Sequence, residues 1–438
     1  MTSYEIPAGR PEEKFTEKYP LLSRTEAMFE SARCIYCFDA PCIKSCPTSI
    51  DIPTFIRKIG TGNLRGSART ILKANLLGDS CARVCPVEVL CESTCVFNDS
   101  ERPPIPIGRL QRYAMQHGFA SDLLPKADPT GHSIGLVGGG PASLACAGTL
   151  ALLGHSPVIY EKDAWPGGLN ATGVAPYKLK LEDNLDEVEY IRSLGVEIKT
   201  GVEIGVDIAA EDLLGKHKAL FLGVGLGADS TLGVHGAEGD DVVGAVQWIR
   251  RLKTDPTLAI DGVMHAVIVG GGNTAIDAMR ELIGLGVPFV SMVYRRSRDE
   301  MSGYDHELSP ALQDGVSLVE NAAVAEIQRE NGKVTGVHIV ETDPNGKPTE
   351  TDLGVLPADL VVMAIGQGKL ADLVKQFRGV GLTAKGNVVV DDLMVTGNPR
   401  IFAGGDAING GKEVVNAVHD GQVAARSIDE LLRRSDHG

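Results

Sequence analysis

Eight of the nine cysteines of this chain lie in two tight groups near its N-terminus. The first group is Cys34, Cys37, Cys42 and Cys46, followed at once by a proline, and the second is Cys81, Cys85, Cys91 and Cys95. Thiolates at such short spacing, with a Cys-Pro pair, are soft ligands suited to a cubane iron–sulfur cluster, in which each iron needs one ligand. The two groups therefore predict two 4Fe-4S clusters.

Structural zinc and disulfide bonds are the two alternative interpretations of these cysteines. Zinc ligands usually come as cysteine pairs well separated in sequence, often with histidine, whereas here four thiols crowd together twice without a histidine among them. Disulfides belong to oxidising compartments, and the first residues, Met-Thr-Ser-Tyr-Glu-Ile, lack the basic and apolar segments of a secretory signal. We therefore favour clusters and expect a cytoplasmic protein.

Two glycine-rich turns of one pattern follow later in the chain, each between an apolar segment and a helical one. Residues 138–143 are Gly-x-Gly-x-x-Ser, and residues 270–275 are Gly-x-Gly-x-x-Ala. Such a turn lets the backbone approach a pyrophosphate, which then lies at the N-terminus of the helix. A single match is a weak signal, but two in register, each followed by a second apolar strand, predict two dinucleotide-binding βαβ units.

The residues that end the second strand of each unit differ in charge. Glu161 stands there in the first unit, where a carboxylate would bind ribose hydroxyls. Arg295 and Arg296 stand there in the second unit, where paired guanidinium groups suit a 2′-phosphate. We therefore expect NADP(H) rather than NAD(H) in the second unit, with a solvated basic surface as the alternative.

The C-terminal part carries a further signal. Residues 400–406 (Arg-Ile-Phe-Ala-Gly-Gly-Asp) end a strand with an acid, and a helix is expected from Val414. This segment resembles one in two-nucleotide flavoproteins of the glutathione-reductase type, where the aspartate contacts the flavin ribityl chain. The resemblance assigns the first unit and this tail to FAD. Beyond residue 133 the chain has only Cys146, among small apolar residues, so the clusters are the expected outlet for flavin electrons.

These motifs require a particular set of elements. Segments 54–59 and 67–74 have helical apolar spacing, and from residue 133 short Val/Ile/Leu strands alternate with glycine turns and helices, as in parallel α/β sheets. The predicted fold is an α/β flavoprotein with two dinucleotide-binding domains (glutathione-reductase-like, tandem Rossmann-type) and an N-terminal α-helical iron–sulfur domain. The expected domains are 1–125 with both clusters, 126–245 as the first part of the FAD domain, 246–370 for NAD(P), and 371–438 as the second part of the FAD domain.

Composition narrows the class of function. The chain has 438 residues, 43% hydrophobic and 23% charged, as in an ordinary globular protein. Its net charge of −15 argues against binding to nucleic acid or to an anionic membrane. The uncharged stretch 134–154 is long enough to suggest a membrane span, but three glycines and a proline interrupt it, so we expect strand, turn and helix.

Cysteine groups followed by two nucleotide folds resemble, over nearly the whole chain, the small subunit of bacterial glutamate synthase and the N-terminal half of dihydropyrimidine dehydrogenase. Residues 39–48, 51–56, 75–78 and 107–111 favour the pyrimidine branch. The resemblance implies crossed ligation, with one cluster on Cys34, Cys37, Cys42 and Cys95 and the other on Cys46, Cys85, Cys91 and Gln111. Cys81 is then not a ligand, although counting thiols alone makes it one. The glutamate synthase branch carries an acid where this chain has Gln111.

Cofactor contacts follow from the motifs and from the same resemblance. FAD contacts are expected at Val84, Gly138, Gly140, Pro141, Ala142, Ser143, Glu161, Gly167, Gly168, Leu169, Lys178, Gly405, Asp406 and Val414. NADP(H) contacts are expected at Gly270, Gly271, Gly272, Asn273, Thr274, Arg295, Arg296, Ala364, Ile365 and Gly366. The chain departs from the family at two places: Lys178 replaces an arginine, and Ser302 replaces a basic residue for which Arg298 is the candidate substitute.

The resemblance implies an electron-input subunit. NADPH would give a hydride to FAD, and single electrons would pass through two 4Fe-4S clusters, a reaction that needs proximity and no acid or base from the protein. A chain of 438 residues is too short to contain the substrate-reducing half of the family as well. We therefore expect a hetero-oligomer with a larger, FMN-containing partner subunit that reduces uracil or thymine. The alternatives are a glutamate synthase small subunit, another electron-transfer subunit of this build, and a non-catalytic protein that holds zinc and nucleotide.

Overall fold

The computed structural model describes residues 4–436 of the chain. Its N-terminal part is helical, as expected from segments 54–59 and 67–74. Side-chain caps fix where these helices begin: Ser23 forms a capping box with Glu26, and Asp51 accepts a hydrogen bond from the backbone of Thr54. The helices are α1 (Arg24–Arg33), α2 (Pro41–Lys44), α3 (Ile52–Gly60), α4 (Leu64–Ala74), α5 (Gly78–Val84) and α6 (Ile107–Gly118).

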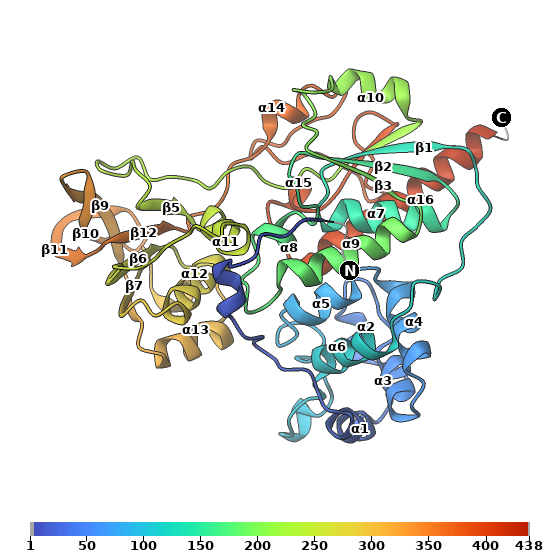
Figure 1. Ribbon diagram of the computed structural model, residues 1–438, viewed down its shortest axis with the longest axis horizontal. Helices are drawn as coiled ribbons and strands as arrows, with labels where there is room; N and C mark the ends of the chain where they lie inside the picture. The colour runs from blue at the N-terminus through green and yellow to red at the C-terminus, as the bar shows by residue number, and fades with distance from the viewer. Residues whose placement is uncertain (1–3, 437–438) are drawn as a thin grey trace.

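The first sheet is parallel, with strand order β13-β4-β1-β2-β3. Its strands are β1 (Ser133–Val137), β2 (Ser156–Glu161), β3 (Glu197–Thr200), β4 (Ala219–Leu222) and β13 (Ile401–Ala403). The helices around it are α7 (Pro141–Leu152), α8 (Leu169–Thr172), α9 (Leu181–Ser193), α10 (Ala210–Lys216), α14 (Ala371–Val374), α15 (Asp406–Asn409) and α16 (Val414–Asp436). The long helix α16 runs beside α7 (Figure 1), so the C-terminal tail completes this domain.

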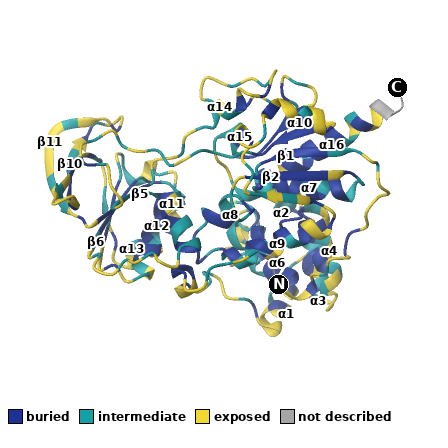
Figure 2. Ribbon diagram, turned by 45° about the horizontal axis from the view of Figure 1, so that its top comes forward, coloured by how far each residue is buried: buried dark blue, intermediate teal, exposed yellow. Residues whose placement is uncertain are grey.

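The uncharged stretch 134–154 folds as expected, into strand β1, a glycine turn and helix α7. Most residues of both elements are buried, and the ribbon there is mainly dark blue in Figure 2. Among the described residues, no helix combines the length and the apolarity that crossing a bilayer requires.

The second sheet is also parallel, with strand order β5-β12-β6-β7-β8. Its strands are β5 (Val242–Gly244), β6 (His265–Val269), β7 (Phe289–Val293), β8 (Ser317–Val319) and β12 (Leu360–Met363), and its helices are α11 (Ala245–Thr254), α12 (Asn273–Gly284) and α13 (Asp305–Gln313). A three-stranded antiparallel sheet extends from its far end (Figure 1), formed by β9 (Ala322–Glu330), β10 (Lys333–Thr342) and β11 (Pro348–Pro357).

Two of the expected domain ranges differ from the structure. Strand β5 pairs with β12 of the second sheet, so the chain leaves the FAD domain before residue 242 and not at 245. Residues 4–20 fall in the expected range 1–125, yet they run along both α/β domains: the Trp165 indole of the FAD domain donates to the carbonyl of Glu5, and the Arg10 guanidinium donates to the carbonyl of Lys253 in the nucleotide-binding domain. These contacts are long-range, and local sequence patterns did not predict them.

The helical domain and the first sheet share one hydrophobic core. Phe55 and Leu110 of the helices and Leu136 and Val418 of the FAD domain belong to the same buried cluster. Burial of continuous apolar surface fixes the helices against the sheet, because exposing it to water would cost about 25 cal/mol per Å². The cysteine groups are therefore held at a fixed position relative to the first nucleotide turn.

Candidate functional site

The eight N-terminal thiols surround two cavities in the helical domain. The first cavity is lined by Cys34, Cys37, Cys42 and Cys95, among apolar side chains such as Ile56. Burial raises the pKa of Cys42 to about 11, as expected for a thiol in an apolar environment. In the part of the chain that the structure describes, no three His, Cys, Asp or Glu side chains converge closely enough to ligate a single metal ion. The thiols instead stand around a space, an arrangement that fits a polynuclear group.

The second cavity is lined by Cys46, Cys85 and Cys91 together with both Cys81 and Gln111. Gln111 is buried on α6, and its Nε2 donates to the carbonyl of Gly78 at 2.7 Å. A hydrogen bond that the Cys85 thiol donates to Cys81, added to burial, raises the pKa of Cys85 well above the ordinary thiol value. The thiols are thus divided as the crossed ligation requires. The choice between Cys81 and Gln111 as eighth ligand stays a prediction, because both side chains face this cavity.

The first glycine turn packs too closely for side chains. A Cβ on Gly138, where φ is +89°, would lie 2.6 Å from the carbonyl oxygen of Gly223, and one on Gly139 would lie 2.9 Å from Glu161 Oε2. Gly168, with φ of +55°, presses its backbone against Gly140. The structure therefore brings the segment 167–169 to the turn at the N-terminus of α7, where a pyrophosphate would bind.

Glu161 ends β2 beneath this turn. Its carboxylate accepts hydrogen bonds from the backbone N–H groups of Gly139 at 2.6 Å and Asp163 at 2.8 Å. Burial raises the pKa of Glu161 despite these two donors. The placement agrees with a carboxylate that binds ribose hydroxyls, as the sequence predicts.

Two further observations fit a bound flavin nucleotide at the first turn. The hydroxyl of Ser143 is fully buried and has no hydrogen-bond partner among the described residues. Gly405, from the C-terminal tail, lies against Ala142 of α7, and its N–H donates to Asp420 at 3.0 Å. Asp406 follows it, and burial raises the pKa of this carboxyl. The expected contact Val84 ends α5, and Pro141, Leu169 and Val414 begin α7, α8 and α16.

The second glycine turn repeats this construction. A Cβ on Gly270, where φ is +144°, would lie 2.3 Å from the carbonyl oxygen of Ala364, and one on Gly271 would lie 2.5 Å from the Tyr294 ring. Ala364 follows β12, the neighbour of β6, so the segment 364–366 stands beside the turn. Gly272 and Asn273 begin α12, and Thr274 follows on its first turn. This open turn at a helix N-terminus fits a nicotinamide dinucleotide.

The arginines of the second site stand two and three residues past β7. Arg295 is exposed and Arg296 is half-buried, and neither forms an ion pair with any described residue. Arg298 is less available to bind a phosphate, because its guanidinium donates to Asp305 and to Ser309, the latter at 2.9 Å. Two unpaired guanidinium groups at the end of this strand are suited to a phosphate.

Lys178 has partners that the sequence did not predict. Its Nζ lies 2.6 Å from Glu307 Oε2 and 2.8 Å from Asp277 Oδ1, and both carboxylates belong to the nucleotide-binding domain. Burial alone would lower the pKa of Lys178, but the two carboxylates raise it. Lys178, an expected flavin contact, thus stands where the two domains meet. Neither Glu307 nor Asp277 belongs to a motif that could have revealed this role.

Comparison with known families accounts for both halves of the chain. A family model described as dihydropyrimidine dehydrogenase domain II, 4Fe-4S cluster, matches residues 11–123, and one described as pyridine nucleotide-disulphide oxidoreductase matches residues 132–421. The chain belongs to the pyridine nucleotide-disulphide oxidoreductase family. It is an NAD(P)H-dependent oxidoreductase, and its cofactors are FAD and 4Fe-4S iron–sulfur.

Two kinds of relatives match it almost end to end. The glutamate synthase [NADPH] small chain of Escherichia coli K12 is 32% identical over 448 residues, covering 96% of this chain and 94% of the relative. The NAD-dependent dihydropyrimidine dehydrogenase subunit PreT of the same strain is 33% identical over 426 residues, covering 96% and 98%. The superfamily expected from the cysteine groups and nucleotide folds is thereby confirmed.

Solved structures confirm the fold of the nucleotide-binding part. FprA of Mycobacterium tuberculosis, in complex with NADPH, superposes with a TM-score of 0.55 at 19% identity, covering 70% of this chain and 86% of that one. Thioredoxin reductase of T. acidophilum gives 0.56 at 21% identity, covering 69% and 99%. At these identities the likeness concerns the fold alone, which is the predicted pair of dinucleotide-binding domains.

Proposed function

We propose that this chain is the electron-input subunit of a complex of the dihydropyrimidine dehydrogenase type. It oxidises NADPH and supplies electrons to a larger, FMN-containing subunit that reduces uracil or thymine to the dihydropyrimidine. The observation that carries this choice is Gln111 on the wall of the second thiol cavity. Because its Nε2 is bonded to Gly78, its Oε1 is the amide atom left to act as a ligand. By resemblance, glutamine at this place belongs to the pyrimidine branch.

The residues of the chain bind and orient the cofactors. The turn at 138–143, Glu161 and Asp406 hold FAD, and the turn at 270–275 with segment 364–366 holds the nicotinamide nucleotide. When bound, FAD supplies the exchange between a hydride and single electrons, and two 4Fe-4S clusters carry those electrons. The protein contributes proximity, and beyond residue 133 its only cysteine is Cys146, which is buried.

The lining of the two cavities supports an order of electron transfer within this proposal. Val415 of α16, next to the expected flavin contact Val414, lines the second cavity. The first cavity is lined only by residues between 34 and 107 of the helical domain. Electrons therefore enter at the cavity of Cys46, Cys85 and Cys91 and leave toward the partner at the cavity of Cys34.

One observation favours the glutamate synthase small subunit as a second candidate. Arg295 and Arg296 suit a 2′-phosphate, and the related glutamate synthase chain is named for NADPH, whereas the related PreT subunits are named NAD-dependent. A pyrimidine-reducing complex driven by NADPH would thus differ from those relatives in its nucleotide.

Purification of the tagged chain together with its native partner distinguishes the two candidates. We expect mass spectrometry to identify an FMN-containing partner, and we expect the complex to oxidise NADPH when uracil is added. The matched assay replaces uracil with glutamine and 2-oxoglutarate. The pyrimidine assignment is overturned if NADPH is oxidised only with glutamine and 2-oxoglutarate and the partner hydrolyses glutamine. That result would establish the glutamate synthase small subunit instead.

A further inference from the structure

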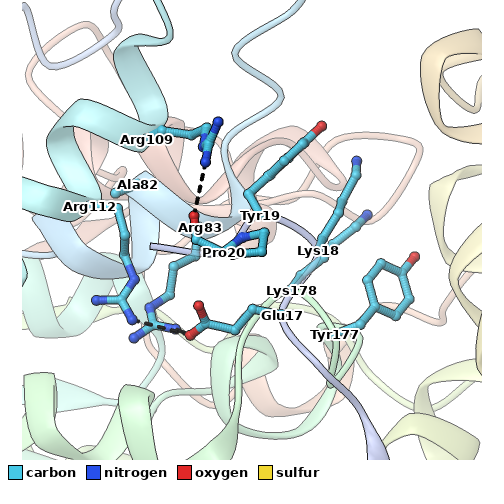
Figure 3. A pocket seen from close by; sticks show the side chains of 10 residues that line it. All are labelled: Glu17, Lys18, Tyr19, Pro20, Ala82, Arg83, Arg109, Arg112, Tyr177 and Lys178. Atoms are coloured by element: carbon cyan, nitrogen blue, oxygen red, sulfur yellow. Dashed lines mark hydrogen bonds and ion pairs between the residues drawn. The ribbon is translucent and has the colours of Figure 1, made fainter. Parts of the chain in front are cut away.

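The FAD domain and the nucleotide-binding domain meet at a buried group of ion pairs. Glu307, on the first turn of α13, reaches from the nucleotide-binding domain to two lysines, with its Oε2 2.6 Å from Lys178 Nζ and its Oε1 3.3 Å from Lys18 Nζ. Lys18 and Lys178 lie side by side and point the same way (Figure 3), toward this carboxylate. The side chains of Glu307 and Lys178 are only 8% and 11% exposed, so water screens the pair weakly.

A second carboxylate shares the same lysine. Asp277 of α12 accepts a hydrogen bond from the Tyr177 hydroxyl at 2.6 Å and lies 2.8 Å from Lys178 Nζ. Tyr177 and Lys178 are consecutive residues of the FAD domain, so two neighbouring side chains are held by two helices of the other domain. Since Lys178 is also an expected flavin contact, the flavin edge and the nucleotide-binding helices are joined through one side chain.

The residues just before Glu307 reach both expected cofactor sites. The backbone N–H of Tyr304 donates to Asn273 Oδ1 at 2.9 Å, and Asn273 belongs to the second glycine turn. The Tyr304 hydroxyl donates to Glu413 Oε1 at 2.7 Å, and Glu413 directly precedes α16 in the tail of the FAD domain. The segment 304–307 therefore contacts the nucleotide turn, the flavin tail and Lys178 within four residues.

We propose, on the basis of the proposed function, that Glu307 is a positioning residue for hydride transfer. By binding Lys178 and Lys18, Glu307 holds the nucleotide-binding domain against the FAD domain at the separation that the reaction requires. Glu307 does not line the glycine turn and need not touch either cofactor. Its removal should therefore slow flavin reduction without weakening nucleotide binding, because the turn at 270–275 and the Tyr304–Asn273 bond remain.

Stopped-flow reduction of the full-length holoprotein by NADPH under anoxic conditions tests this role. We expect Glu307→Gln to lower the limiting rate of flavin reduction by about 10- to 100-fold, the cost of a misplacement of roughly 1 Å. The Kd for NADPH, read from the concentration dependence, should stay within about threefold. Asp314→Asn is the matched control, since it removes one exposed carboxylate at the other end of α13 and should change neither value.

A structural readout accompanies the kinetics. Hydrogen exchange of the peptide around residues 174–180 should be faster in Glu307→Gln than in the wild type, because the contact that holds Lys178 is lost. Glu307→Asp retains the charge with a shorter reach and should recover part of the rate; it also serves if the Gln variant does not fold. A wild-type limiting rate together with unchanged hydrogen exchange in the Gln variant overturns the proposal. If only the Asp variant folds, the same result in that variant overturns it. An effect confined to the Kd for NADPH also overturns it.

The same experiment separates this proposal from the proposed function. If NADPH fails to reduce the flavin of the wild-type protein, the proposed function is wrong, and the exchange measurement alone then decides whether Glu307 holds the domains together. Equal exchange in the wild type and the Gln variant would in that case refute the positioning role.

Discussion

At the scale of single residues, the second thiol cavity poses the sharpest question. It presents four cysteines and one glutamine, Gln111, to a group that needs four ligands. Cys81 lies on α5, one helical turn before Cys85. The crossed ligation implied by the family leaves Cys81 as a neighbour of the cluster and makes Gln111 a ligand.

Substitution of Cys81 decides between these ligands. We predict that Cys81→Ser retains about eight iron atoms per chain and unchanged cluster spectra, because two complete 4Fe-4S clusters remain. Cys85→Ser, one turn away on the same segment, should lose the second cluster. Iron analysis and electron paramagnetic resonance of both variants provide the measurement. Loss of half the iron in Cys81→Ser would instead make Cys81 the ligand.

The arginine pair makes a separate prediction about the nucleotide. We expect Arg295→Ala combined with Arg296→Ala to lower kcat/KM for NADPH by about 10- to 100-fold, since hydrogen bonds to charged groups contribute about 1.5–3 kcal/mol. The kcat/KM for NADH is the internal control and should change little, because NADH has no 2′-phosphate. Equal losses with both nucleotides would show that these arginines do not recognise the phosphate.

At the scale of elements, helix α5 connects the cysteine groups to the FAD domain. Its N-terminus is bound by Glu187 of α9, whose carboxylate accepts hydrogen bonds from the backbone N–H groups of Asp79 at 2.9 Å and Ser80 at 3.3 Å. The helix then carries Cys81 and ends just before Cys85. Burial, followed by the nearby charge of Asp79, raises the pKa of Glu187 to about 8.

This raised pKa predicts a dependence of stability on pH. Between the ordinary value of 4.5 and about 8, the folded protein holds a proton on Glu187 that the unfolded chain has released. The free energy of unfolding therefore falls as pH rises, by at most about 1.4 kcal/mol per pH unit from this group. Glu187→Gln keeps an oxygen acceptor and has no proton to lose, so thermal unfolding across this range should show a reduced slope. A variant with the full wild-type slope would contradict the assignment.

Local patterns predicted most of the elements that form the site. The glycine turns, their flanking strands and the helix from Val414 follow from residue periodicity and from backbone positions such as Gly138, where a side chain would collide. The predicted boundary at residue 245 puts β5 in the FAD domain, because a strand of three residues carries no signal of the strand with which it pairs. Glu307 and Lys178 are 129 residues apart, so only the folded chain reveals their ion pair.

At the scale of the whole molecule, the N-terminal segment joins all three domains. Arg10 is buried and bonds to Glu12, to Glu182 of α9 and to the carbonyl of Lys253 of α11. Further along, Glu17 accepts hydrogen bonds from Arg83 and Arg112 of the helical domain (Figure 3). One N-terminal segment therefore contacts the helical domain, the FAD domain and the nucleotide-binding domain.

Lys253 is the most deeply buried cation of this contact region. Its Nζ donates to the carbonyls of Asn170, Val174 and Leu179, all from the FAD domain, and the side chain has no exposed surface. We predict that Lys253→Met lowers the free energy of unfolding by about 3–5 kcal/mol, because three buried carbonyls lose their donor and Glu12 keeps Arg10 but loses the charge of Lys253.

Urea denaturation of the holoprotein measures this effect. Lys375→Met, which removes an exposed lysine paired with Asp372, is the control and should stay within about 0.5 kcal/mol of the wild type. Similar midpoints for both variants would show that Lys253 does not hold the two domains together.

The proposed function requires electrons to pass from the flavin to the N-terminal clusters within one chain. The most direct measurement is an anoxic NADPH titration of the purified chain without its partner, with flavin absorbance and cluster paramagnetic resonance recorded on the same sample. We expect flavin absorbance to bleach and a signal of reduced iron–sulfur to appear as NADPH is consumed. A flavin that is fully reduced while the clusters stay oxidised, or a chain that holds no iron, would contradict it.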